Sequence, residues 1–128
     1  MGAKLLLLTP CDYALTSANG KLSAIGIFDD ITMPANGVSL ATFFVVAQML
    51  LDSVGVLGKK SIRVSIAAPS GEIVIEDAVD VDLSDVSRKR VNVLMVFPLG
   101  KFDSKGAHTI SVAVDGVPFA ETRSIDVK

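Results

Sequence analysis

Apolar and polar residues alternate along most of this sequence with a period of two residues, which is the pattern of a β-strand with one buried face. The clearest case runs from Lys59 to Ala67, where Ile62, Val64 and Ile66 alternate with serine and arginine. Residues 108–114 repeat the pattern. These alternations predict strands that bury one face each.

Two segments are apolar at successive positions and predict strands that are buried on both faces. Residues 91–97 are apolar apart from Asn92, which is typical of a central strand. Residues 41–54 could form a helix by length, but they contain Phe43, Phe44, Val45 and Val46 in succession. Aromatic and β-branched residues suit a pleated surface, so we expect a strand over residues 42–50.

Turn residues separate these predicted strands. Asn19-Gly20 and Asp115-Gly116 are two-residue hairpin signals, and Pro69-Ser70-Gly71 supplies a further turn. Residues 98–106 are expected to form a loop, and 117–127 the last strand. Residues 72–83 read as a long strand whose apolar phase changes, which predicts a bulge near Asp77-Ala78.

The pattern as a whole predicts about eight strands and no helix. We therefore expect residues 1–128 to form a single domain, an all-β antiparallel sandwich of the immunoglobulin type. Neither a linker nor a repeat interrupts the sequence.

The balance of charge argues against nucleic acid as a partner. Twelve basic and fourteen acidic residues give a net charge of -2, and the one basic cluster, at 88–90, reads as a solvated loop. Half of the residues are apolar and the mean hydropathy is +0.54. Such a composition indicates apolar surface that a partner covers.

The first residues permit two interpretations. Lys4, four leucines and Cys11 resemble a truncated lipoprotein signal, but a signal needs roughly 7–15 apolar residues before its cleavage site. The longest apolar stretch elsewhere, 40–51, is shorter than the ~20 residues of a membrane-spanning helix. We therefore interpret residues 4–8 as a strand, with no signal peptide and no membrane anchor, and expect the protein in the cytoplasm or in a virion.

Three short motifs in the first thirty residues resemble an uncharacterised family of small bacterial and phage proteins. They are Asp12-Tyr13-Ala14, Gly20-Lys21-Leu22 and Gly26-Ile27-Phe28-Asp29. A Pro-Ser-Gly-Glu turn and the closing hairpin at 106–116 fit the same family. The resemblance implies a β-sandwich and no activity, so it carries no functional residue to this chain.

The residues of these motifs have a structural interpretation of their own. The only tyrosine, Tyr13, is expected on the inner face of a sheet with a partner for its hydroxyl. A glycine in mid-strand, such as Gly26, indicates a bulge or a close approach of two backbones. We expect a structural role for Asp12, Tyr13, Gly20, Lys21, Gly26, Phe28 and Asp29.

No catalytic or metal site is predicted, and no cofactor. His108 is the only possible base and reads as a surface or edge histidine, while Cys11 reads as a small core residue. Five carboxylates between Glu76 and Asp85 lack the curved loop of a calcium site and read as a solvated strand face. Residues 55–61 echo a phosphate-binding loop, but the required Gly and Ser/Thr positions are not met.

These observations favour a non-enzymatic module that binds a protein partner or assembles with itself. A capsid decoration protein of a phage is the alternative, and a module that binds a small ligand or a sugar, or an enzyme, fits less well. The loop 51–58 is unusually apolar, and this chain departs there from the family it resembles. Either this loop folds back and caps one end of the core, or it inserts into a neighbouring subunit or a capsid. We favour insertion, because the strands already supply ample apolar residues for the core, so the predicted partner surface is formed by Leu51, Val54, Val56 and Leu57.

Overall fold

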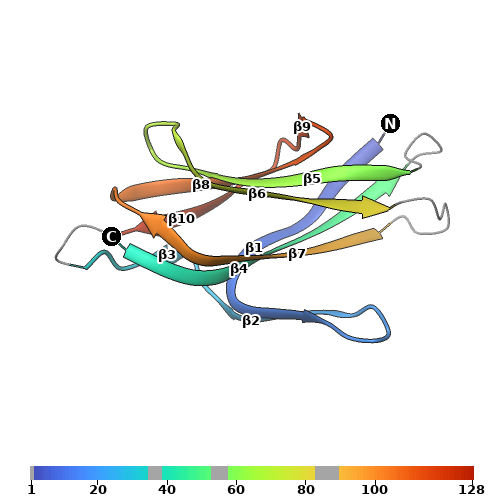
Figure 1. The fold of residues 1–128 in the computed structure, drawn as a ribbon, viewed down its shortest axis with the longest axis horizontal. Helices are drawn as coiled ribbons and strands as arrows, with labels where there is room; N and C mark the ends of the chain where they lie inside the picture. The colour runs from blue at the N-terminus through green and yellow to red at the C-terminus, as the bar shows by residue number, and fades with distance from the viewer. Residues whose placement is uncertain (1, 35–38, 53–57, 83–89) are drawn as a thin grey trace.

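The computed structural model describes residues 2–34, 39–52, 58–82 and 90–128 (Figure 1). These residues form ten strands and no helix. In chain order the strands are β1 (Gly2–Thr16), β2 (Leu22–Ile27), β3 (Asp30–Ile31), β4 (Ser39–Asp52), β5 (Lys59–Ala67), β6 (Ile73–Asp82), β7 (Arg90–Phe102), β8 (Gly106–Val114), β9 (Val117–Pro118) and β10 (Arg123–Val127). Of the described residues, none lies in a helix long and apolar enough to cross a membrane.

The strands form two sheets that pack face to face. Sheet A has the order β2-β1-β4-β7, and sheet B has the order β3-β10-β8-β5-β6, with β9 also paired to β8. All pairs are antiparallel except β3 with β10. Strands β1, β4 and β7 stand in the places of strands A, B and E of an immunoglobulin sandwich, and β5, β8 and β10 in those of C, F and G. The predicted immunoglobulin-like sandwich is confirmed.

The core lies between the inner faces of the two sheets. Alternate residues of β5 and β8 point into it, which is why the period-two pattern was so regular there. Phe43 of β4 is 1% exposed and its ring lies 5.5–6.0 Å from the rings of Phe28, Phe97 and Phe102, measured between centroids. Aromatic rings at these separations stabilise each other beyond the area they bury.

A third layer covers part of the outer face of sheet A. Strand β1 pairs with β4 as far as Cys11 and from there pairs with β2, so the chain bends near Pro10 and the β1–β2 hairpin (residues 11–27) lies beneath the sheet (Figure 1). A second buried cluster fills the space between the hairpin and the sheet. Its members are Cys11, Ala14 and Val46, with Leu22, Ala24, Phe44 and Leu94 packed around them.

This third layer explains why two strands are apolar on both faces. Residues 42–50 are indeed a strand, within β4, and Val45 and Val46 are both fully buried although they point to opposite faces. The prediction that residues 91–97 form a central strand is wrong, because β7 is the edge of sheet A. Its inner residues face the core, and the outward Leu94 packs against the hairpin cluster.

Two predicted boundaries also differ from the structure. Residues 98–102 were expected in a loop, yet β7 continues to Phe102, which fills the core and pairs with Ser39 of β4. The last strand is interrupted: β9 and β10 both pair with β8, and between them Phe119 packs against the core. The predicted hairpin at Asp115-Gly116 is present, with positive φ at both residues.

The bulge in β6 is not where the sequence indicated. The register shift falls between Ile66 and Ala67 of β5, which pair with Ile75 and Ile73, so Val74 is the extra residue. From Ile75 to Asp82 the pairing with β5 is continuous, including Asp77 and Ala78. Because β6 is an edge strand, its apolar residues are only partly covered, and this blurred the periodicity of the segment.

Candidate interaction surface

The three motifs of the first thirty residues come together in the β1–β2 hairpin. Gly20 lies in its turn with φ of 82°, a conformation that costs glycine little. The turn is closed by three hydrogen bonds around Ser17, which accepts from Gly20 and Lys21 and donates its own N–H to the carbonyl of Lys21. Asn19-Gly20 therefore forms the hairpin turn that the sequence predicted.

Gly26 shapes the bend of the hairpin. Its φ is 70°, and a Cβ atom at this position would lie 2.8 Å from Cγ and 2.9 Å from Cβ of Asp12. Only glycine fits this approach without displacing the opposite strand. Asp12 itself is exposed on β1.

Phe28 and Asp29 connect the hairpin to the sandwich. The Phe28 ring packs edge-on against Phe43 in the core, and its N–H donates to the carbonyl of Pro10 at 3.3 Å. The carbonyl of Asp29 accepts the N–H of Asp126 in β10 at 2.8 Å. These contacts hold the base of the hairpin between the two sheets.

Tyr13 does not lie on an inner face, as the sequence suggested, but is 50% exposed. Its ring contacts Phe44 edge-on, with centroids 5.3 Å apart. Ile25 lies opposite Tyr13 in the hairpin register and is 57% exposed, and Ile27 is 58% exposed. Together with Leu15 these side chains form the apolar hairpin face: Tyr13, Leu15, Ile25 and Ile27.

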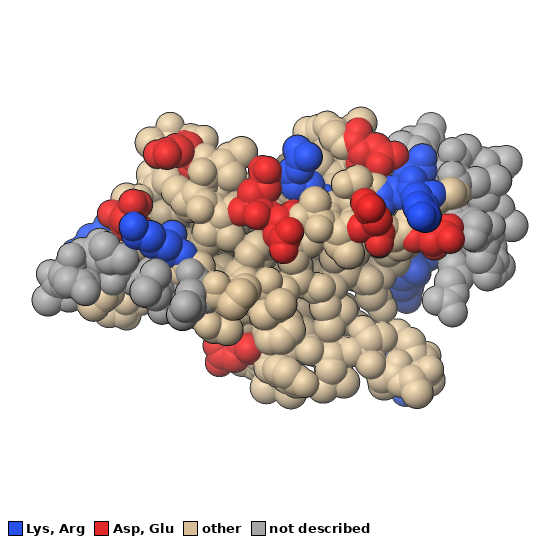
Figure 2. Space-filling model, viewed as in Figure 1, with Lys and Arg blue, Asp and Glu red and all other residues tan. Residues whose placement is uncertain are grey.

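The surface around this face is nearly free of charge. Figure 2 shows Asp, Glu, Lys and Arg gathered over sheet B in the upper part of the view, whereas the hairpin at the bottom is almost wholly uncharged. Residues 22–27 of β2 contain no ionisable side chain. Asp12 and Lys21 are the only charged residues of the hairpin. Four exposed large apolar residues on one hairpin of such low charge are typical of a surface that meets another macromolecule.

Polar contacts at the tip of the hairpin fix it to sheet A. The Asn92 side-chain amide donates to the carbonyl of Gly20 at 3.3 Å, and the Gln48 amide donates to Asn92 Oδ1 at 2.9 Å. Gln48 and Asn92 are partners in the β4–β7 register. These hydrogen bonds fix the position of the hairpin, and therefore of the apolar hairpin face, relative to sheet A.

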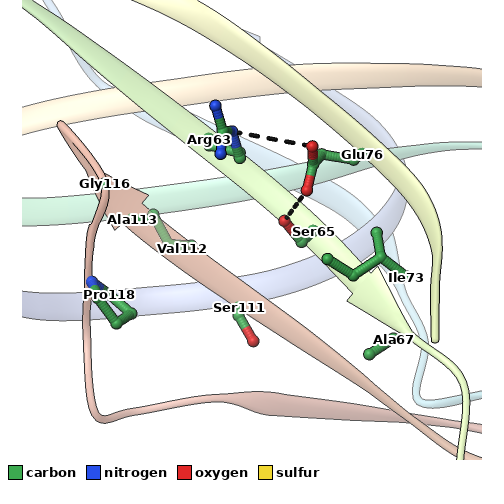
Figure 3. Close-up of a pocket in the computed structure, with 10 residues that line it drawn as sticks. All are labelled: Arg63, Ser65, Ala67, Ile73, Glu76, Ser111, Val112, Ala113, Gly116 and Pro118. Atoms are coloured by element: carbon green, nitrogen blue, oxygen red, sulfur yellow. Dashed lines mark hydrogen bonds and ion pairs between the residues drawn. The ribbon is translucent and has the colours of Figure 1, made fainter. Parts of the chain in front are cut away.

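An open groove of about 320 Å³ lies on the outer face of sheet B (Figure 3). Its floor is made of small side chains of β5 and β8, among them Ser65 and Ser111, and Pro118 and Ile73 stand at its sides. Ser65 donates to Glu76 Oε2 at 2.8 Å, and Arg63 Nε lies 3.9 Å from Glu76 Oε1. Glu76 thus pairs with both Ser65 and Arg63, and the opposite charges of Glu76 and Arg63 lie side by side.

His108 does not serve this groove. It was expected at the surface or an edge, but it is fully buried, with its ring 5.3 Å from that of Phe102 in the core. Its Nδ1 donates to the carbonyl of Gly106 at 3.0 Å, and Nε2 has no hydrogen-bond partner among the described residues. Alternation along β8 turns Ser111 to the opposite face, so no Ser–His pair forms.

Cys11 is buried at the bend of β1, in the cluster beneath sheet A. Burial raises the pKa of its thiol, and hydrogen bonds from the backbone of Tyr13 and Ile25 only partly oppose this. The nucleophilic thiolate is therefore disfavoured at neutral pH.

The acidic strand places Asp80 and Asp82 on one face, opposite Ser61 and Lys59 of β5. Over the residues that the structure describes, no three His, Cys, Asp or Glu side chains are grouped closely enough to hold a metal ion. Asp85 lies outside those residues, as do Val54, Val56 and Leu57 of the predicted partner loop. Leu51 belongs to β4 and pairs with Ala3.

The apolar hairpin face was not predicted from the sequence, although a signal was present. In β2 the residues that face sheet A, Leu22 and Ala24, are apolar, and so are Ile25 and Ile27 on the other side. A hairpin strand that is apolar on both faces can bury only one of them against its own sheet, and the other face stays exposed unless another molecule covers it.

Comparisons with known proteins identify a family and a fold. No curated protein matches the chain. An immunoglobulin-like protein from Pseudomonas aeruginosa is 14% identical with a TM-score of 0.44, and the match covers 100% of this chain and 98% of the other. The CARDB domain of a Pyrococcus furiosus protein, solved in complex with di-metal ions, is 16% identical with a TM-score of 0.43, over 97% and 94% of the two chains.

Likeness at this level carries no inference about what the present chain binds. The model of a family of unknown function, DUF6941, matches residues 6–127, which is nearly the whole chain. The chain therefore belongs to the family of unknown function DUF6941.

Proposed function

We propose that this protein is a non-enzymatic interaction module that contacts a protein partner through the apolar hairpin face. The observation that carries the proposal is the exposure of Tyr13, Ile25 and Ile27, each at least half exposed, on a hairpin whose only charged residues are Asp12 and Lys21. Burying a large apolar side chain fully is worth roughly 1.5–3 kcal/mol, so covering this face supplies a substantial part of a binding free energy.

The arrangement of the remaining polar groups supports a binding role rather than catalysis. The buried His108 and Cys11 lie in different clusters, on opposite sides of sheet A, and the serines of the groove have no histidine beside them. Nucleophilic catalysis requires the nucleophile and its base within hydrogen-bond reach. The chain instead exposes apolar side chains on a fixed scaffold, which is how sandwich domains commonly meet protein partners.

Site-specific photo-crosslinking in cells tests the proposal. A photoreactive phenylalanine analogue replaces Ile27 on the hairpin face in one variant and Val117, which is 62% exposed on β9, in the control. We expect a discrete cross-linked protein band from position 27 and none of comparable yield from position 117. Equal cross-linking from both positions, or none from position 27, would contradict the proposal.

A further inference from the structure

The open edges of the two sheets differ in how they are protected against pairing with another strand. An edge strand exposes unpaired N–H and C=O groups, and proteins guard such edges with charges, prolines or very short strands. Edge β6 carries Glu76, Asp77, Asp80 and Asp82. Asp77 pairs in register with the buried Val64, so it is an inward-pointing charge on that edge.

Other edges are guarded as well. Edge β7 contains Pro98, which lacks an N–H, a register shift nearby, and the charged residues Arg90 and Lys101. Edge β3 is two residues long.

The first half of β1 pairs only with β4, and its open edge carries Lys4 and a register shift between Leu5 and Leu7. Edge β9 is two residues long and contains Pro118. Edge β2 differs from all of these, since its six residues include no charge and no proline.

The hydrogen bonding of the hairpin shows which backbone groups of β2 are open. The carbonyl of Lys21 accepts the N–H of Ser17, so the backbone of Lys21 faces β1. Groups alternate along an antiparallel strand, and those of Leu22 and Ala24 therefore point to the open edge. Ala24 lies near the middle of β2, and Ser23 and Ile25 on either side of it are exposed.

We infer that a second copy of this chain pairs with β2 along this edge, antiparallel and about a two-fold axis at Ala24. The inference goes beyond the proposed function, because the pairing uses the backbone edge of β2 and leaves the apolar hairpin face for a further partner. The pairing joins the two β1–β2 hairpins into one layer, with two strands from each copy. Ile25 of each copy lies opposite Ser23 of the other, so the two apolar hairpin faces become one continuous surface.

Charge is what favours a second copy as the occupant. A two-fold axis places every residue near its own counterpart, so a charged edge repels itself. Edge β6 would oppose carboxylates to carboxylates, and β7 has Arg90 and Lys101 at its two ends. From Leu22 to Gly26, strand β2 opposes only Leu, Ser, Ala, Ile and Gly to one another, and Ile27 lies opposite Lys21 of the other copy, so no like charges meet. The unpaired backbone groups of β2 are self-complementary.

The inference is tested by the mass of the protein in solution across a concentration series, with sedimentation velocity and native mass spectrometry. The unmodified chain should show a dimer that dissociates on dilution. Ile25→Lys brings two ammonium groups close to the axis and should weaken the dimer at least about tenfold. The matched control is Ile73→Lys, a change of the same kind at a 54% exposed isoleucine of β6, which should leave the dimer intact.

Mixing two variants tests the register itself. Ser23→Glu and Ile25→Lys should each dimerise poorly alone, but an equimolar mixture should form a mixed dimer, because the carboxylate introduced in one copy then faces the ammonium group introduced in the other. A dimer that survives Ile25→Lys, or a mixture that stays monomeric while circular dichroism shows both variants folded, overturns the inference.

A chain that remains monomeric up to roughly millimolar concentration also overturns the inference. That outcome leaves the proposed function standing if position 27 still cross-links to a different protein. If neither self-association nor cross-linking depends on the hairpin, both fail.

Discussion

The outer faces of the two sheets differ in the kind of side chains that they present. The outer face of sheet B is open to solvent and carries small or charged side chains, including the Arg63–Glu76 pair. The outer face of sheet A is largely apolar and is partly covered by the β1–β2 hairpin. The outer side of the hairpin is itself apolar, so apolar surface remains exposed to solvent on this side of the molecule.

This difference suggests that the two sides of the molecule differ in their tendency to associate. On the proposed function, the charges of sheet B and its edge β6 disfavour association on one side of the molecule, and the apolar hairpin face favours it on the other. A substitution in the hairpin layer should therefore act on the stability of that layer and on association, whereas the equivalent substitution in sheet B should act weakly. Four predictions test this difference, from the largest expected effect to the smallest.

Gly26→Ala should have the largest effect. A left-handed conformation costs about 1–2 kcal/mol for a residue with a side chain, and the overlap of the new Cβ with Asp12 adds a cost of about 1–3 kcal/mol. Urea denaturation measures the loss. Gly116→Ala in the β8–β9 turn is the matched control, because its φ of 81° is equally positive but its Cβ meets no atom within 4 Å. Equal losses for the two variants would contradict the close approach at Gly26.

Val46→Ala should lower the free energy of unfolding by about 2 kcal/mol, because it removes two methyl groups from the fully buried cluster beneath sheet A and leaves a cavity. Val79→Ala in edge strand β6 removes the same atoms from a side chain that is 39% exposed and should cost less than half as much. Thermal and chemical denaturation report both values. A small loss at Val46 would mean that the hairpin does not cover the sheet in solution.

Asn92→Ala should cost about 1 kcal/mol, the value of a typical hydrogen bond, and the loss should be confined to the hairpin. The variant removes the contact with Gly20 and leaves the Gln48 amide without its partner. Cys11 reports whether the hairpin is packed on sheet A, because its buried thiol should become accessible to solvent when the hairpin separates from the sheet. Reaction with a thiol reagent should be faster in Asn92→Ala than in the unmodified chain, and unchanged in Ser111→Ala on sheet B.

Asp115 should give the smallest effect, visible only as a dependence of stability on pH. The Ser61 N–H, which donates to Oδ1 at 2.9 Å, and Lys60, whose Nζ is 3.3 Å from Oδ2, hold the pKa of this carboxyl below its ordinary value. A lowered pKa in the folded state stabilises the fold above the ordinary pKa of about 3.8, and the stabilisation is lost as the pH falls through the folded value.

The comparison for this last prediction is Asp115→Asn, which keeps a residue suited to positive φ but does not titrate. Its stability relative to the unmodified chain should improve as the pH falls below about 3.8. Lys60→Gln should retain most of the pH dependence, because the Ser61 hydrogen bond is the larger cause of the shift. A profile for Asp115→Asn that parallels the unmodified chain over this range would contradict the prediction.

The fold was predictable because β5 and β8 each have one buried face, and their alternating residues reveal it directly. The edge position of β7 was not predictable. A strand that is covered on both faces has the same apolar pattern at the edge of a sheet as at its centre. The apolar hairpin face was not predicted from the sequence for a related reason. Ile25 and Leu22 are both apolar, and only the bend at Gly26 and Pro10 decides which of them faces sheet A.

The bend in β1 gives the two halves of one strand different places in the order of folding. Its second half pairs locally, Cys11 with Ile27, and isolated hairpins form within about 1–10 μs. Its first half must wait for β4, whose own pairing with β7 joins residues as distant as Phe43 and Phe97, and sandwiches with such contacts fold in about milliseconds to seconds. During that interval the hairpin exposes both of its apolar faces, so the yield of refolding should fall as protein concentration rises, and a chaperone that binds extended apolar segments should find its first target in this hairpin.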